Sequence, residues 1–148
     1  MRAVIQRVSQ ASVTVEQRVT GQIQAGLLVL LGVEAGDTES DLAFVLKKTI
    51  GLRIFDDEQG KLNLAIRDVG GELLIVSQFT LLGDVRQGNR PSFISAAAPE
   101  VAQEMYEEFV RRARAEKIVV QTGVFRAEMQ VSLTNAGPVT IVIDSRRA

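Results

Sequence analysis

Apolar residues in the first third of the chain recur with the short period of β-strands. Val4, Ile5 and Val8 form one strand-like run, and residues 12–15 alternate polar and apolar positions, as a half-buried strand does. Gln22-Ile23 continues the pattern. Residues 26–33 are apolar at almost every position, which favours a central strand covered on both faces. This part of the chain is therefore expected to be β-rich.

Two amphipathic segments predict helices. The first begins at Thr38, where Thr38-x-x-Asp41 fits a capping box, and Gly51 is placed to end it. The second begins at Pro99, a residue favoured in the first turn of a helix. The predicted apolar face of the first helix consists of Leu42, Val45, Leu46 and Thr49. That of the second consists of Val101, Met105, Tyr106, Phe109, Val110 and Ala113.

Further strands are predicted between and after the helices. Two short ones, 52–55 and 62–66, flank a turn, and residues 72–82 read as one long strand. The last three are expected at 118–121, 128–134 and 139–143, with a loop joining the final pair. This order predicts an α+β fold, in which two helices cover a curved mixed or antiparallel sheet or an open barrel. No repeat or linker divides the sequence, so residues 1–148 are expected to form a single domain.

The absence of histidine and cysteine restricts the possible chemistry more than any other feature of the composition. It excludes a Ser-His-Asp triad, a Cys-His pair, and metal sites built on thiolate or imidazole. Catalysis must then use carboxylates, lysine, hydroxyls, backbone dipoles or groups of the substrate. The acidic run Asp56-Asp57-Glu58 is the one candidate metal cluster, and its Gly-containing turn favours simple solvent exposure. We therefore expect neither a metal nor another cofactor.

The remaining composition is that of an ordinary globular protein. Apolar residues make up 46% of the chain and charged residues 24%, which argues against disorder. The opening lacks the features of a signal peptide, and no apolar run is long enough to cross a membrane. We therefore expect a cytoplasmic protein without membrane contact. A net charge of −1 argues against a generic nucleic-acid binder but allows a local basic patch.

Two segments break the local pattern, and such breaks tend to mark functional or strained sites. In Ser77-Gln78-Phe79-Thr80, polar residues interrupt an apolar strand; alternation would place Ser77 and Phe79 on one face and Gln78 and Thr80 on the other. The alternative is a strand that simply leaves the core. The second segment, 135–138, is either a hairpin loop or a rigid cis Gly137-Pro138 element that projects two carbonyls in one direction.

These two segments, with several others, resemble the D-aminoacyl-tRNA deacylase family, once called D-tyrosyl-tRNA deacylase. The resemblance extends from Met1 to about Ile143, and the order and spacing of the motifs make it specific. The motifs are Ile5-Gln6-Arg7-Val8, Ala11-Ser12-Val13, residues 26–33, Ser77-Gln78-Phe79-Thr80-Leu81, Arg90-Pro91-Ser92-Phe93, Gln121-Thr122-Gly123-x-Phe125 and Asn135-Ala136-Gly137-Pro138-Val139-Thr140.

The resemblance implies a homodimer that hydrolyses the ester bond of D-aminoacyl-tRNA, and of mischarged glycyl-tRNA, as chiral proofreading in translation. Gly137 and Pro138 of one subunit would enter the partner's site as a cis pair and exclude L side chains. Arg7 would hold that element in place. Phe125 and Met129 would form walls near the terminal adenosine of the tRNA.

The resemblance also assigns the Ser77–Thr80 segment to catalysis. The Phe79 N–H would bind the substrate carbonyl and Gln78 would line the pocket, while the ribose 2′-hydroxyl of the tRNA would help activate water. Thr80 is the natural candidate nucleophile, but the chain has no imidazole to activate its hydroxyl.

Two other functions remain open at this point. One is a non-catalytic dimeric protein that binds RNA ends, and the other is a hydrolase of small D-aminoacyl esters or amides. Among the arginines, a solvated helix face is favoured over phosphate contact for Arg111, Arg112 and Arg114. For Arg86 and Arg90 contact with tRNA and simple exposure are left equally open.

Overall fold

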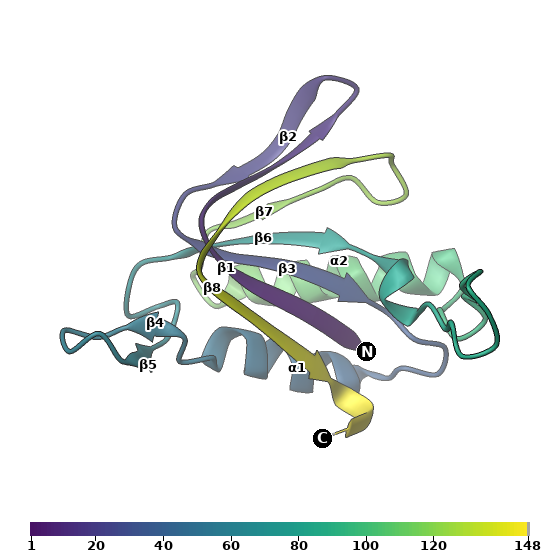
Figure 1. The fold of residues 1–148 in the computed structure, drawn as a ribbon. Helices are drawn as coiled ribbons and strands as arrows, with labels where there is room; N and C mark the ends of the chain where they lie inside the picture. Colours follow the sequence, from purple (N-terminus) through teal and green to yellow (C-terminus); the bar gives the residue numbers. More distant parts are fainter. Residues whose placement is uncertain (148) are drawn as a thin grey trace.

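The computed structural model describes residues 1–147 and contains a strongly curved, mixed six-stranded sheet (Figure 1). The strand order is β2-β1-β3-β6-β7; β8 lies outside this order and pairs with β1 along almost its whole length. The β3–β6 and β6–β7 pairs are parallel and the pairs made by β1 are antiparallel. The strands are β1 (Arg2–Val15), β2 (Arg18–Ile23), β3 (Gly26–Gly32), β6 (Glu72–Ser77), β7 (Val120–Thr122) and β8 (Gln130–Asp144).

Two helices, α1 (Glu39–Gly51) and α2 (Pro99–Ala115), cover one face of this sheet (Figure 1). The main core lies between them and the strands, where inward side chains of β1, β3 and β6 are fully buried. A second apolar cluster fills the inside of the curl on the other face. The predicted α+β class with a curved mixed sheet and two helices is therefore confirmed. Within residues 1–147, neither helix is long and apolar enough to span a membrane.

The helix boundaries follow the local signals in the sequence. The Thr38 N–H donates to Asp41 Oδ2 at 2.7 Å, as expected at the start of α1, and α2 begins at Pro99. The apolar face of α1 is buried as predicted. On α2, however, Ala102 is buried and Val101 is exposed, so the predicted stripe was wrong by one position in the first turn. Ala102 shares the 3.6-residue spacing of the buried positions that follow it.

Residues 72–82 do not form the single long strand that the pattern predicted. Strand β6 ends at Ser77, and residues Phe79–Leu82 form a short 3₁₀ helix, η1. The turn brings Leu82 back into the core beside Gly32, where a Cβ would lie 2.5 Å from Leu82 Cδ2. The alternation argument for Ser77 to Thr80 was therefore wrong, because only the first of these residues lies in a strand.

The predicted pair of strands at 128–134 and 139–143 is one continuous strand, β8. Asn135 pairs with Val8 and Thr140 with Gln6, so four residues of β8 lie opposite the single residue Arg7. The segment 135–138 is therefore part of a wide bulge, and the hairpin loop was a wrong prediction. Both halves of β8 pair with the same strand, β1, so the chain does not reverse here.

The remaining strands are shorter than predicted. Strand β7 begins at Val120, and β4 (Phe55–Asp56) and β5 (Leu62–Leu64) form a small separate hairpin. Its turn is fixed by Asp57, whose carboxylate accepts the N–H groups of Gln59 and Lys61. These hydrogen bonds hold the pKa of Asp57 below its usual value. Among residues 1–147, no acidic cluster is arranged to hold a metal ion.

Candidate functional site

A pocket of about 670 Å³ lies where β3 and β6 end, between η1, the start of α2 and the segment that joins β7 to β8. We call it the β6 pocket. Most of its lining residues are apolar or aromatic. The lining residues are Val33, Val76, Ser77, Gln78, Phe79, Phe93, Ala96, Ala97, Ala98, Pro99, Ala102, Phe125, Arg126, Ala127, Met129 and Val131.

Aromatic rings form two sides of the β6 pocket. Phe79 is more than half exposed and meets Phe93 edge to face, with the ring centroids 5.1 Å apart. On the other side, Phe125 lies 6.0 Å from the ring of buried Tyr106. The Tyr106 hydroxyl donates to the Ile75 carbonyl at 2.8 Å, and burial raises its pKa to about 12. Tyr106 therefore stays neutral and acts as a fixed support for the Phe125 wall.

One backbone N–H at the rim of the pocket, that of Phe79, is free to bind a ligand. The Gln78 N–H donates to the Leu31 carbonyl at 2.8 Å, which extends the β3–β6 ladder by one residue. Phe79 is the first residue of η1, and the first N–H groups of a helix have no acceptor within it. Among residues 1–147, no hydrogen bond from the Phe79 N–H is found. This donor is therefore available at the edge of the β6 pocket.

The hydroxyl groups of this segment lack a base. Thr80 is exposed and lies outside the pocket lining, and its Oγ1 accepts a hydrogen bond from the Gln78 amide. Ser77 is half-buried in the lining. Of the residues around the β6 pocket in the described part of the chain, Arg126 carries the one formal charge. An arginine stays protonated and cannot accept a proton from either hydroxyl.

A second group of predicted residues gathers around Arg7. The guanidinium donates from Nε to the Ala136 carbonyl at 2.9 Å and from Nη1 to the Ile54 carbonyl at 2.8 Å. It also forms an ion pair with exposed Asp56 at 3.5 Å. The Gly137-Pro138 peptide is cis, and both residues are exposed. Arg7 thus connects the bulge of β8 to the residue that precedes β4.

These two groups lie at opposite ends of strand β3. Arg7 pairs with Leu27 near the start of β3, whereas Leu31 near its end pairs with Ser77. Leu31 lies four steps along the strand from Leu27, which is roughly 13 Å at about 3.3 Å per residue. Within one protomer, the bulge at Gly137 therefore lies well away from the β6 pocket.

The structure thus brings five predicted residues together and separates three others. Two residues of the pocket lining were not predicted as site residues: Phe93, which was named only as part of a motif, and Arg126. A left-handed backbone at Arg126 was not foreseeable from one sequence. The residues in the β6 pocket are Ser77, Gln78, Phe79, Phe125 and Met129, with Thr80 next to them, and those at the other end are Arg7, Gly137 and Pro138.

Most other arginines considered in the sequence already have carboxylate partners. Arg111 and Arg112 both pair with Glu108, whose pKa their hydrogen bonds lower to about 2. Arg86 is bound in the same way by Asp84, and hydrogen bonds from Arg86 lower the pKa of that carboxyl to about 2. The Arg111 and Arg112 pairs support the interpretation as a solvated helix face.

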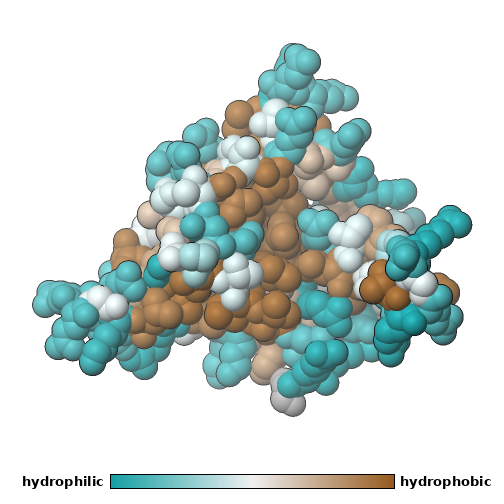
Figure 2. Space-filling model, in the orientation of Figure 1, coloured by the Kyte–Doolittle hydropathy of each residue, from teal (hydrophilic) through white to brown (hydrophobic). Residues whose placement is uncertain are grey.

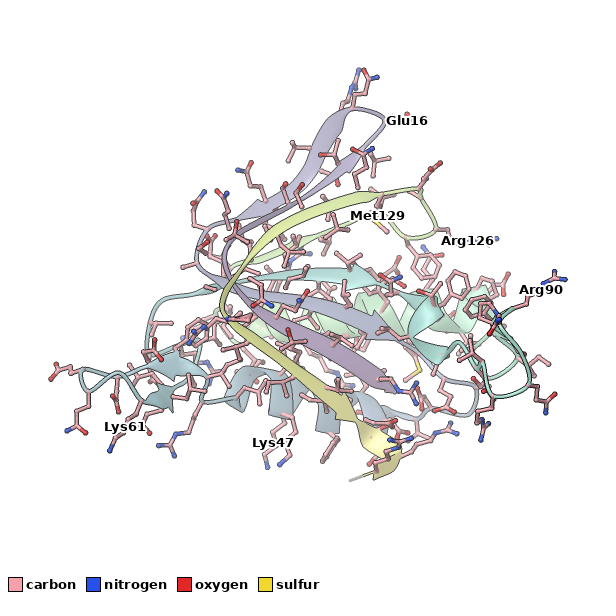
Figure 3. All side chains as sticks on the ribbon, in the orientation of Figure 1. Glu16, Lys47, Lys61, Arg90, Arg126 and Met129 are labelled. Atoms are coloured by element: carbon pink, nitrogen blue, oxygen red, sulfur yellow. The ribbon has the colours of Figure 1, made fainter. Side chains whose placement is uncertain are left out.

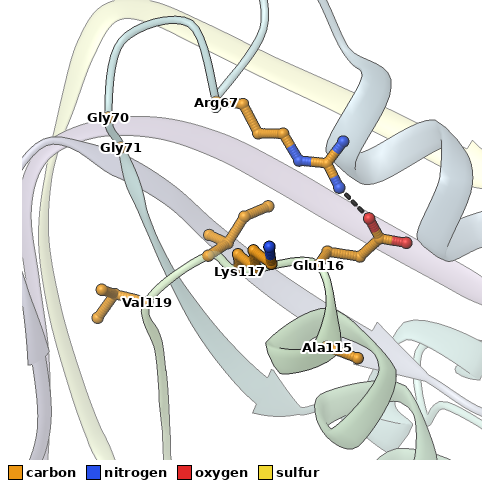
Figure 4. A pocket seen from close by; sticks show the side chains of 8 residues that line it. Arg67, Gly70, Gly71, Ala115, Glu116, Lys117 and Val119 are labelled. Carbon is orange, nitrogen blue, oxygen red and sulfur yellow. Dashed lines mark hydrogen bonds and ion pairs between the residues drawn. The ribbon is translucent and has the colours of Figure 1, made fainter.

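A separate hollow of about 500 Å³ lies at the opposite end of β6, between Gly70-Gly71 and the end of α2 (Figure 4). The Arg67 guanidinium and the Glu116 carboxylate form an ion pair at its edge. None of the predicted site residues contributes to it.

Comparison with known proteins links this architecture to one family. A family model described as D-Tyr-tRNA(Tyr) deacylase matches residues 4–144. The chain is similar to the D-aminoacyl-tRNA deacylase of Desulfitobacterium hafniense, at 58% identity over 147 residues and 99% of each chain. It is also similar to the D-aminoacyl-tRNA deacylase of Kosmotoga olearia, at 57% identity over 99% of each chain.

Two solved structures share the fold. One is a c-Myc DNA unwinding element binding protein, with a TM-score of 0.92 and 40% identity over 97% of this chain and 98% of that one. The other is described as a probable eukaryotic D-amino acid tRNA deacylase, with a TM-score of 0.74 over 96% of this chain and 97% of that one. Its 18% identity makes it a likeness of fold alone.

Proposed function

The chain belongs to the D-Tyr-tRNA(Tyr) deacylase family, and we propose that it hydrolyses the ester bond of D-aminoacyl-tRNA, releasing the free D-amino acid and tRNA. The observation that carries the proposal is the 58% identity to a D-aminoacyl-tRNA deacylase over 99% of both chains. Mischarged glycyl-tRNA is a second substrate, because glycine has no side chain to exclude. The activity is chiral proofreading in translation, in the cytoplasm.

The β6 pocket is the site for the terminal adenosine of the tRNA. Its aromatic and methionine walls suit the faces of a purine, and base–aromatic stacking contributes about 1–3 kcal/mol per base. Phe125 and Met129 are both lining residues, and Met129 packs over Gly123, where a Cβ would lie 2.6 Å from Met129 Sδ. The aminoacyl ester on the ribose then lies toward Ser77, Gln78 and Phe79.

Catalysis at this site uses backbone groups and the RNA itself. The free Phe79 N–H donates to the carbonyl oxygen of the ester and stabilises the negative charge that develops there when water attacks. The ribose 2′-hydroxyl helps to orient and activate that water. The proton passes to the departing 3′-oxygen as the C–O bond breaks. No metal or cofactor takes part, and Thr80 does not act as a nucleophile.

Selection by handedness requires a second protomer. Because Gly137 and Pro138 lie far from the β6 pocket of their own chain, they act in the site of the partner. There their carbonyls form a rigid wall that an L side chain would strike, while a D side chain points away from it. Arg7 holds the wall in place through the Ala136 carbonyl.

The surface for such a homodimer is the open face of the sheet. Figure 2 shows an apolar area at the centre of this face, surrounded by polar side chains. Val4 pairs with both Leu30 and Val142, so the three side chains lie on the same face, and Val142 is 64% exposed. Leu133 is 37% exposed on β8. A contiguous exposed apolar patch is typical of a protein interface. In a dimer with two-fold symmetry, the same patch of both subunits would be buried in the interface.

One assay separates the proposal from its alternatives. The protein is incubated with matched D- and L-aminoacyl-tRNA and with a D-amino-acid ethyl ester. Rapid release from D-aminoacyl-tRNA alone supports the proposed function. Binding of D-aminoacyl-tRNA without release would identify an RNA-end binding protein, and equal cleavage of the small ester would identify a general D-aminoacyl esterase.

A further inference from the structure

Arg126 has a backbone conformation that its side chain does not favour. It lies at the tip of the segment between β7 and β8 (Figure 3), where the Ala127 N–H donates to the Val124 carbonyl and closes a four-residue turn. Arg126 is the third residue of this turn and has a φ of +63°. That position with positive φ belongs to type II turns and favours glycine or asparagine. A long cationic side chain therefore occupies a place where glycine would fit with less strain.

The charge of Arg126 is unbalanced within the described residues. The side chain is exposed, and no ion pair or hydrogen bond of its guanidinium is found among residues 1–147. By contrast, Arg86, Arg111 and Arg112 are each bound by a carboxylate. Arg126 also stands alone as the charged member of the β6 pocket lining. An unpaired cation at the edge of an apolar aromatic pocket is suited to a ligand that is aromatic at one end and anionic at the other.

We propose that Arg126 binds the phosphate on the 5′ side of the terminal adenosine of the tRNA. This inference rests on the proposed function, which places that adenosine in the β6 pocket. The base would lie between the aromatic walls, and the phosphate would emerge at the rim on which Arg126 stands. A guanidinium donates two parallel hydrogen bonds to a phosphate, which gives both affinity and orientation. Arg126 thereby sets the position of the RNA strand as it enters the site.

The test compares three substrates that carry the same D-aminoacyl ester. They are D-aminoacyl-tRNA, the 3′-ester of adenosine 5′-monophosphate, and the 3′-ester of adenosine without a phosphate. The variants are Arg126→Gly, which suits the positive φ, and Arg126→Lys, which keeps the charge. Arg67→Ala removes one positive charge at the opposite end of β6 and serves as the matched control.

The wild-type protein should prefer the 5′-phosphate ester over the adenosine ester in kcat/KM. Arg126→Gly should reduce that preference by roughly 5- to 20-fold, mainly through KM, since a charge-assisted hydrogen bond is lost. Its kcat/KM for the tRNA should also depend less on salt, by about 0.7 in the logarithmic slope expected for one phosphate of a single strand. Arg126→Lys should keep most of the preference, and Arg67→Ala all of it.

Two results would overturn the inference. One is an equal loss on all three substrates, which would make Arg126 a structural residue of the turn. The other is an unchanged preference in Arg126→Gly. Failure of the proposed function would look different, because the wild-type protein would then cleave none of the three esters, or would cleave a D-amino-acid ethyl ester equally well.

Discussion

The Arg7 guanidinium donates to the Ala136 carbonyl at 2.9 Å, across the widest irregularity in the sheet. Arg7 is the residue of β1 that faces the bulge of β8, and its side chain is only 12% exposed. A second hydrogen bond reaches the Ile54 carbonyl. Arg7 therefore supports a bulge that backbone pairing alone does not hold, together with Asn135, whose Oδ1 accepts the Val139 N–H at 3.0 Å. In the proposed mechanism, this bulge carries the wall that rejects L substrates.

Arg7→Ala should destabilise the protein and weaken its selectivity. Two carbonyls lose their donor, so we expect the free energy of unfolding to fall by about 1–3 kcal/mol. Gln6→Ala is the matched control on the same strand, because the Gln6 hydrogen bond to Thr140 is exposed and should contribute less than about 0.5 kcal/mol. Urea unfolding measures the first effect, and cleavage of L-aminoacyl-tRNA measures the second. Equal unfolding midpoints for the two variants would argue against the role given to Arg7.

Phe79→Pro should reduce kcat strongly without unfolding the protein. Proline is accepted at the first position of a helix, and this change removes the backbone N–H that we assign to the ester carbonyl together with the aromatic ring. Loss of such a donor costs about 10²- to 10³-fold in kcat. Phe79→Ala keeps the N–H and loses the ring contact with Phe93, so its defect should lie mainly in KM. A folded proline variant with normal kcat would show that this N–H is not used.

Thr80→Val should cleave D-aminoacyl-tRNA at close to the normal single-turnover rate. The Thr80 hydroxyl is exposed, lies outside the β6 pocket lining and accepts from Gln78, and the pocket lining offers no group to deprotonate it. General-base assistance normally contributes about 10²- to 10⁴-fold, so a catalytic hydroxyl would be unmistakable in rapid-quench measurements. A loss of that size, with substrate binding retained, would make Thr80 a participant in the chemistry.

Tyr106 should ionise only in strongly alkaline solution. Burial raises its pKa to about 12, so the folded protein keeps the phenol neutral where an unfolded chain, with a pKa of roughly 10, would ionise it. The contribution of this pKa difference to the free energy of unfolding is fully present below about pH 10 and declines as the pH rises toward 12. Tyr106 is the single tyrosine of a chain without tryptophan, so absorbance at 295 nm follows it directly. If the phenol of the native protein titrated with a midpoint near pH 10 while circular dichroism showed an intact fold, the buried position of Tyr106 would be contradicted.

Local signals in the sequence were sufficient for the elements that depend on neighbouring residues. The start of α1 at Thr38 and of α2 at Pro99 follow from capping chemistry, which acts within one turn. The central position of β3 follows from its apolar residues on both faces. These features required no knowledge of which segments meet in space.

Features that depend on distant partners were mispredicted. Strand β6 stops at Ser77 because Gly32 of β3 leaves room for Leu82 to turn inward. The bulge at Gly137 exists because both halves of β8 pair with β1. Neither relationship can be recognised from the pattern of apolar and polar residues in the segments concerned. The candidate site residues were predicted from motifs. The pocket that brings Phe79 and Phe125 together joins positions 46 residues apart, however, and one sequence cannot place them in space.

The central claim is that each site combines the β6 pocket of one protomer with Gly137 of the other, and subunit mixing tests it most directly. Phe79→Pro impairs the pocket. Gly137→Ala impairs the wall, because a Cβ would lie 2.7 Å from Arg7 Nη2 at a φ of +129°. When the two variants are unfolded, mixed equally and refolded together, about half of the dimers should be heterodimers, and about a quarter of all sites should carry neither change. The account predicts that L-aminoacyl-tRNA cleavage per unaltered pocket falls to about half of that in Gly137→Ala alone, because half of these pockets then face an unaltered wall. An L-cleavage rate per unaltered pocket equal to that of Gly137→Ala alone would contradict a site shared between protomers.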